Sequence, residues 1–102
     1  MKVNLKENET VIKVADTSYV ESQSRVTGKF ILTNQRIYFK SVEETNNGVD
    51  FEILFSQIRE ILFFNTWKVI PNGLSVITKE GSELKFLIKN RDSWCQMINK
   101  MY

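Results

Sequence analysis

Apolar and polar residues alternate most regularly between Gly28 and Ser41, where the chain reads GKFILTNQRIYFKS. Period-two alternation on both sides of a short polar centre is typical of a β-hairpin. A two-residue loop at Asn34-Gln35 would pair Phe30 with Phe39 and bring the apolar residues onto one face. The pattern therefore predicts two half-buried strands in a defined register.

This register also sets Lys29 opposite Lys40 on the outer face. Like charges directly across two strands cost roughly a few tenths of a kcal/mol unless an acidic residue lies nearby. Two solvated lysines are favoured over an anion site here, because most surface charges are simply solvated.

The same alternation predicts five further strands, which makes seven in total. They are Thr10–Ala15, Val49–Phe55, Ile58 to about Ile70, Leu74–Thr78 and Ser82–Ile88.

Polar stretches rich in asparagine, glycine and proline predict the connections. Residues 16–24 are expected to form a loop, and Pro71–Gly73 a turn. A two-residue loop at Asn47-Gly48 would turn the next strand's apolar residues outward, so an odd-length loop or a bulge is expected there. A three-residue loop at 79–81, with glycine in the left-handed region, would set Val76 opposite Leu84.

Beyond Asn90 the period changes to that of a helix. A stripe with spacing i, i+3, i+4, i+7 predicts an amphipathic helix that docks on the strands. The stripe is Trp94, Met97, Ile98 and Met101, and the candidate caps are Asn90, Asp92 and Ser93.

Composition is that of one ordinary globular domain, with 102 residues, 42% of them hydrophobic and 25% charged. We expect a single domain over 1–102, in which residues 1–9 form a loose N-terminal arm. A net charge of +2 is too small to indicate a nucleic-acid-binding surface. The absence of an apolar leader predicts a cytoplasmic protein.

The chain contains no histidine and one cysteine. This inventory excludes histidine-based acid–base catalysis and His/Cys metal cages, so we expect no enzyme, no cofactor and no metal. Cys95 stands next to the helical stripe, and we expect it to be half covered and chemically inert.

Three segments carry a resemblance to a known family. Gly28–Phe39 resembles the G-x-L-x-L-T-N-x-R-I-x-F core of GRAM domains, and Phe55–Ile58 and Gly73–Gly81 resemble their later motifs. The resemblance covers most of residues 8–101. It implies a mainly β (α+β) fold similar to pleckstrin-homology (PH) domains: a PH-like barrel of two packed antiparallel sheets, seven strands in all, capped by one C-terminal α-helix.

For function, the resemblance implies binding to phosphoinositides, membranes or proteins, here by a free-standing copy of the domain. The loops that bind headgroups in PH domains correspond to residues 15–24, 41–50 and 79–83, which hold seven acids and one lysine. Acidic loops repel phosphorylated lipids. The alternative anion or lipid contacts are Lys13, Arg25, Lys29 and Lys40.

The favoured function is therefore protein–protein contact or self-association through the barrel surface; a membrane-lipid module is the alternative and an enzyme a distant third. Interfaces favour tryptophan and arginine. The candidate surface is Trp67, Lys68, Val69 and Ile70, together with Arg36 and Arg59. In the competing reading, the fifth strand continues to Ile70 and Trp67 packs inward.

Overall fold

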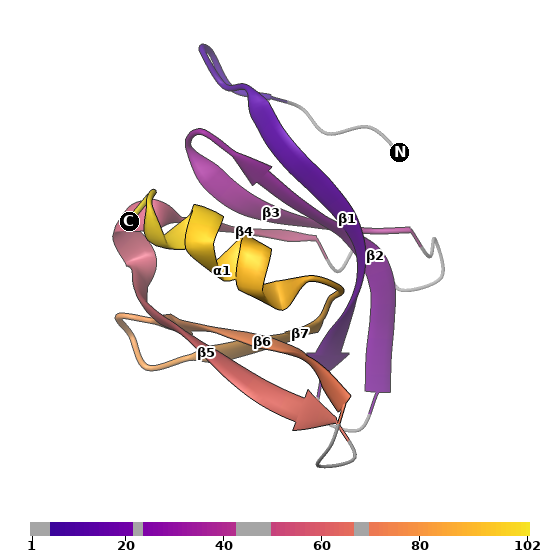
Figure 1. Cartoon of the computed structure of the whole chain (residues 1–102). Helices are drawn as coiled ribbons and strands as arrows, with labels where there is room; N and C mark the ends of the chain where they lie inside the picture. Colours follow the sequence, from indigo (N-terminus) through magenta and orange to yellow (C-terminus); the bar gives the residue numbers. More distant parts are fainter. Residues whose placement is uncertain (1–4, 22–23, 43–49, 67–69) are drawn as a thin grey trace.

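The computed structural model describes residues 5–21, 24–42, 50–66 and 70–102, in which seven antiparallel strands precede one helix (Figure 1). This count confirms the sequence prediction. The elements are β1 (Val11–Glu21), β2 (Ser24–Thr33), β3 (Arg36–Ser41), β4 (Phe51–Leu54), the 3-10 turn η2 (Phe55–Gln57), β5 (Ile58–Thr66), β6 (Ile70–Thr78), β7 (Glu83–Leu87) and α1 (Arg91–Asn99).

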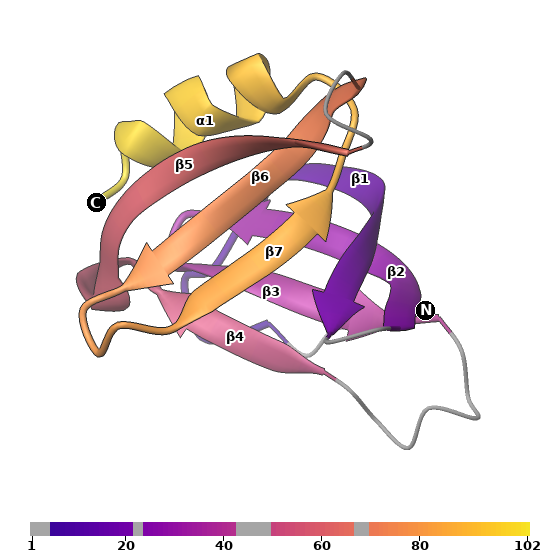
Figure 2. The ribbon, with the colours of Figure 1, turned by 90° about the horizontal axis from the view of Figure 1, so that it is seen from below.

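The strands form one continuous sheet in the order β4-β3-β2-β1-β7-β6-β5. The expected division into two separate sheets is not found, because β1 pairs with β2 along its length and with β7 through Ser18–Val20. The sheet curls so that its two halves face each other (Figure 2). Phe30 on β2 and Phe86 on β7 meet with ring centroids 4.8 Å apart. The sheet stays open, and β4 and β5 are its edges.

The predicted hairpin registers are confirmed. Phe30 lies opposite Phe39, and Lys29 opposite Lys40. Val76 lies opposite Leu84 across a turn in which Gly81 has a φ of 96°. Hydrophobic pattern and turn length together were sufficient to set these pairings.

The register of β4 also matches its pattern, since Phe51 lies opposite Phe39. The apolar side of β4 therefore joins the core side of β3, which a two-residue loop at Asn47-Gly48 would not allow. Residues 43–49, which include this loop and Val49, lie outside the described part of the chain.

Two expected connections are strands instead. The predicted loop over residues 16–24 is wrong for 16–21, which continue β1, and for Ser24, which begins β2; residues 22 and 23 lie outside the described part of the chain. Asp16 and Thr17 are tolerated in the strand because each has a partner: Asp16 pairs with Lys29, and the Thr17 hydroxyl donates to Leu87 C=O at 2.8 Å.

The other misplaced connection is at Pro71–Gly73. These residues belong to β6, which begins at Ile70, and Ile70 pairs with Thr66 at the end of β5. The extension of the fifth strand to Ile70 is therefore wrong. Glycine is required at 73 by close approach rather than by a turn, because an added Cβ would lie 2.6 Å from a ring carbon of Phe64.

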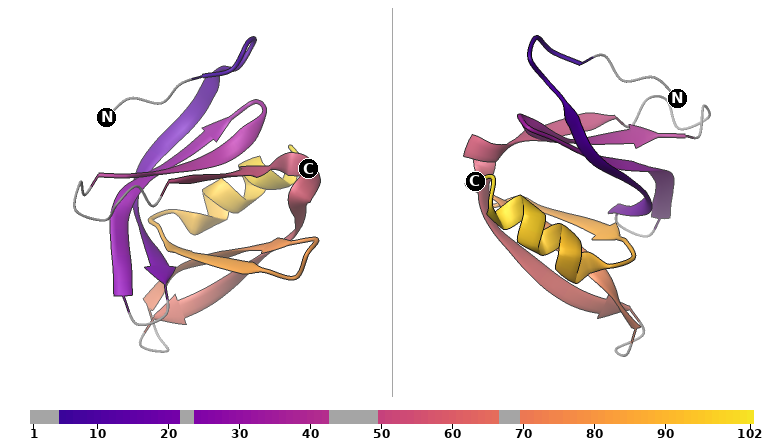
Figure 3. Two further views of the ribbon diagram at one scale, coloured as in Figure 1. Left: turned by 180° about the vertical axis from the view of Figure 1, so that it is seen from behind. Right: turned by 45° about the horizontal axis from the view of Figure 1, so that its top comes forward.

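Helix α1 closes one end of the curled sheet (Figure 3). Trp94 and Ile98 are buried, with 1% and 0% of their surface exposed, as the stripe predicts. The Trp94 ring meets Phe30 of β2 at 5.0 Å between centroids. Asn90 occupies the N-cap position in the left-handed region, without a side-chain cap bond. Cys95 is half-buried.

Candidate interaction surfaces

The turn between β2 and β3 holds the N-terminal arm. Asn34 accepts a hydrogen bond from Thr10 N–H at 2.8 Å and donates one to Asn8 C=O at 3.0 Å. Gln35 donates to Glu7 C=O at 2.9 Å. The loose arm expected from the sequence is therefore wrong for the residues just before β1. We call this set of contacts to the turn the arm latch.

A buried ion pair anchors the arm latch. The carboxylate of Glu9 has no exposed surface and lies 2.8 Å from Arg36 Nε, and it also accepts the Thr33 hydroxyl at 2.6 Å. The hydrogen bond from Arg36 lowers the pKa of Glu9 to about 2, although burial acts in the opposite direction. Arg36 Nη1 also donates to Glu52 at 2.5 Å. Both carboxylates thus converge on one guanidinium.

Arg36 was a candidate interaction residue, and the structure removes it from that surface. Its side chain is only 6% exposed, and its charge is already matched by Glu9 and Glu52. The sequence signal that was missed is the run Thr33–Arg36, in which four consecutive polar residues form the turn and all contribute to the arm latch.

Among the remaining candidates, Arg59 and Ile70 lie at opposite ends of β5. Arg59, with 56% of its side chain exposed, stands at the start of β5, and Ile70 pairs with Thr66 at the far end. Thr66 lies seven positions beyond Arg59 along β5, which corresponds to about 23 Å. Trp67, Lys68 and Val69 lie outside the described residues.

The facing lysines of the first hairpin have acidic partners. Lys29 pairs with Asp16, and Lys40 Nζ lies 2.7 Å from Asp50. The hydrogen bond to Asp50 raises the pKa of Lys40. Burial opposes ionisation of Asp50, but hydrogen bonds from Lys40 and from Ser41 N–H leave its pKa below the ordinary value. These pairs relieve the like-charge contact and reduce the attraction of both lysines for an anion.

Lys13 and Arg25, the other two alternative anion or lipid contacts, lie in different parts of the molecule. Lys13 Nζ lies 5.0 Å from the centroid of the Trp94 ring and 3.4 Å from Ser93 Oγ, so it packs on the start of α1. Arg25 is exposed and pairs with Val20 near the other end of β1. The four predicted anion contacts therefore do not converge.

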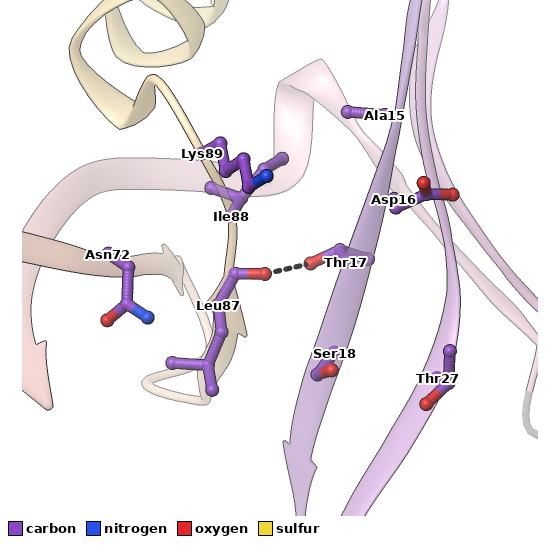
Figure 4. A pocket seen from close by; sticks show the side chains of 9 residues that line it. All are labelled: Ala15, Asp16, Thr17, Ser18, Thr27, Asn72, Leu87, Ile88 and Lys89. Carbon is purple, nitrogen blue, oxygen red and sulfur yellow. Dashed lines mark hydrogen bonds between the residues drawn. The ribbon is translucent and has the colours of Figure 1, made fainter.

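A cleft of about 480 Å³ opens where β1 and β7 separate. β1 supplies one wall, and the segment after β7 supplies the other (Figure 4). The Thr17 hydroxyl crosses the cleft to Leu87 C=O. Its lining residues are mostly small and polar: Ala15, Asp16, Thr17, Ser18, Thr27, Asn72, Leu87, Ile88 and Lys89.

This cleft offers hydrogen bonds and little charge. Lys89 is its single cation, and Asp16 is already paired with Lys29. One lysine does not match a multiply phosphorylated headgroup, which needs several converging cations. Within the described ranges, no group of three or more His, Cys, Asp or Glu residues is placed to hold a metal ion.

The β5–β6 hairpin carries exposed apolar side chains at the edge of the sheet. Leu62, Phe63 and Ile70 are 46%, 44% and 44% exposed. Tyr102 at the C-terminus bonds to the backbone of Ile61, and burial is the main cause of its raised pKa. This contact covers one point of the β5 edge. We call Leu62, Phe63 and Ile70, with the adjoining edge of β5, the hairpin edge.

None of the helices in the described ranges has the length and apolarity needed to span a bilayer. No curated protein matches the sequence.

The family model for the GRAM domain matches residues 1–102. The fold is similar to the C-terminal domain of an unknown protein from Leishmania infantum, with a TM-score of 0.77 at 17% identity over 91% of this chain and 84% of that one. It is also similar to the Vps36 N-terminal PH domain, with a TM-score of 0.75 at 14% identity over 96% and 82% of the two chains.

A third similar structure contains the linker and DH/PH domains of p115-RhoGEF, with a TM-score of 0.71 at 8% identity over 92% of this chain. Only 29% of that larger chain is matched. At these identities the likeness shows a shared fold.

Proposed function

Since the chain belongs to the GRAM domain family, whose PH-like fold is that of a binding module, we propose that it is a non-catalytic protein-interaction domain that makes its contact through the hairpin edge. The observation that carries this proposal is the exposure of Leu62, Phe63 and Ile70 at a sheet edge. Long, apolar edge strands promote association, and most proteins blunt or cover them.

The hairpin edge suits the addition of a partner strand. Ile61 uses its backbone to bond Tyr102 on the free side of β5, and residues two apart direct their backbone groups to the same side. The backbone of Phe63 therefore also points outward. Leu62 and Phe63 project to opposite faces, so an added strand would find an apolar neighbour on each face. Trp67 follows in the sequence and supplies a residue type enriched in hot spots.

Two experiments distinguish self-association from binding to a different protein. Sedimentation velocity at increasing protein concentration reports a dimer directly. A photo-reactive phenylalanine analogue at Phe63 reports the partner in an extract of the native cell. Leu62→Glu should remove the contact in either assay. Val14→Glu is the matched control, because Val14 is equally exposed, at 45%, but lies on β1.

Retained association in Leu62→Glu, or equal losses in both variants, contradicts this surface. Binding to phosphoinositide vesicles that survives Leu62→Glu and is lost on replacement of Lys13 or Lys89 would support a membrane-lipid module instead. The charges argue against that outcome, since Lys29 and Lys40 are paired with acids.

A further inference from the structure

A second cavity lies between β4 and the turn joining β6 to β7. Its volume is about 250 Å³. We call it the corner pocket. Phe51, Ile53 and Leu84 give it apolar walls, and its two charged lining residues, Glu52 and Glu80, are both acidic.

The backbone of β4 presents hydrogen-bonding groups to this pocket. Leu54 N–H donates to Gln57 Oε1 at 2.9 Å, on the side away from β3. Residues two apart in a strand direct their backbone groups to the same side, so Glu52 N–H and C=O also point away from β3. Among the described residues, neither group has a hydrogen-bond partner. An extended segment could pair with both.

The charge at the pocket comes mainly from Glu80. Glu52 is already bonded to Arg36 and lies 3.5 Å from Lys6 Nζ. Glu80 is exposed in the β6–β7 turn and has no ion-pair partner among the described residues. An apolar wall beside a free carboxylate fits a side chain with an aliphatic stem and a cationic head.

We propose that the corner pocket binds a short extended segment of a partner protein that carries a lysine or arginine. The segment pairs its backbone with Glu52, lays the stem of its basic side chain on Phe51 and Leu84, and places the cation at Glu80. Charge complementarity selects this occupant, since the carboxylate of Glu80 attracts a cation and repels an anionic headgroup. This second surface is independent of the hairpin edge.

The test uses the ¹⁵N-labelled full chain and a blocked pentapeptide, Thr-Val-Lys-Val-Thr, in an NMR titration. Saturable shifts should concentrate at Glu52, Leu54 and the amides of the β6–β7 turn. The dissociation constant should be on the order of 1 mM, as for a small contact. Replacing the peptide lysine by norleucine keeps the stem and removes the charge, and should weaken binding about fivefold.

Glu80→Lys should weaken binding by at least about fivefold. Lys79→Glu is the matched control in the same turn and should bind at least as tightly as the parent chain. Leu62→Glu should bind normally, which separates this proposal from the hairpin edge. No saturable shift at the pocket, equal binding of a glutamate-containing peptide, or pocket shifts caused by phosphoinositide vesicles would overturn the proposal.

Discussion

At the turn of the β2–β3 hairpin, Arg36 lies between two carboxylates with 6% of its side chain exposed, whereas on the β5–β6 hairpin Leu62 is 46% exposed beside a free edge. Both hairpins come from alternating sequences, and arginine is the stronger interface residue by type. The structure reverses that expectation because the interactions of Arg36 are already satisfied within the domain. A binding candidate is therefore better judged by what its groups already contact than by residue type.

The largest expected effect is the loss of Arg36. Arg36→Met leaves the buried carboxylate of Glu9 without its cation, which should lower the free energy of unfolding by about 3–5 kcal/mol. Arg59→Met removes an exposed arginine and should change it by less than about 0.5 kcal/mol. Urea denaturation of both variants measures the difference. Equal effects would show that the arm latch does not depend on its ion pair.

The next prediction concerns the stability of the fold at acidic pH. The pKa of Glu9 falls from 4.5 to about 2 on folding, so the unfolded chain binds the proton more readily. The stabilising contribution of this carboxylate is complete above pH 4.5 and is lost as the pH falls towards 2. Denaturation midpoints measured across this window should decline in the parent chain. Glu9→Gln should be less stable at neutral pH and show a shallower decline, and an unchanged slope would contradict the assigned cause.

A smaller effect on stability is expected at Asn34, whose side chain accepts one hydrogen bond from the arm and donates another to it. Asn34→Ala removes the hydrogen bonds to Thr10 and Asn8 and should cost about 1–2 kcal/mol. Limited proteolysis should also cut earlier near residues 5–10. Asn99→Ala, at an exposed position of α1, serves as the control. A stable variant with an uncut arm would place the holding contacts elsewhere.

The smallest effect on stability is expected on the other hairpin. Leu62→Glu should shift the free energy of unfolding by no more than about 0.5 kcal/mol, because Leu62 is an exposed residue on an edge strand and lies outside the buried core. Leu74→Ala, at a fully buried position of the same hairpin, should cost about 2–5 kcal/mol. A large loss for Leu62→Glu in the monomer would mean that this side chain supports the fold rather than a contact.

Local patterns predicted the local parts of the structure. The registers at Phe30–Phe39 and Val76–Leu84 and the helical stripe around Trp94 follow from period and turn length. The same periodicity predicted the seven strands and the helix, and the resemblance to GRAM domains agreed with this count. The two packed sheets that the resemblance implied are not found, because β1 pairs with strands on both of its sides and joins all seven into one sheet.

The arm latch and the hairpin edge were harder to predict from the sequence, because both depend on contacts between residues that are far apart in the chain. Glu9 and Arg36 are separated by 27 residues, and no local spacing links a carboxylate in a polar arm to an arginine in a turn. Gly73 and its neighbours resemble a turn by composition, although the close packing of Phe64 is what requires the glycine. Exposure of Leu62 likewise depends on β5 being an edge strand, which only the topology reveals.

Backbone hydrogen exchange tests the contrast between the two hairpins most directly. The amides of Thr10 and Arg36 bond to Asn34 and Thr33 in the arm latch, so they should exchange slowly at any protein concentration. The amide of Phe63 should exchange quickly in the dilute monomer and slow when the dimer or partner complex forms. A slowly exchanging Phe63 in the monomer, or a fast Thr10, would contradict the account.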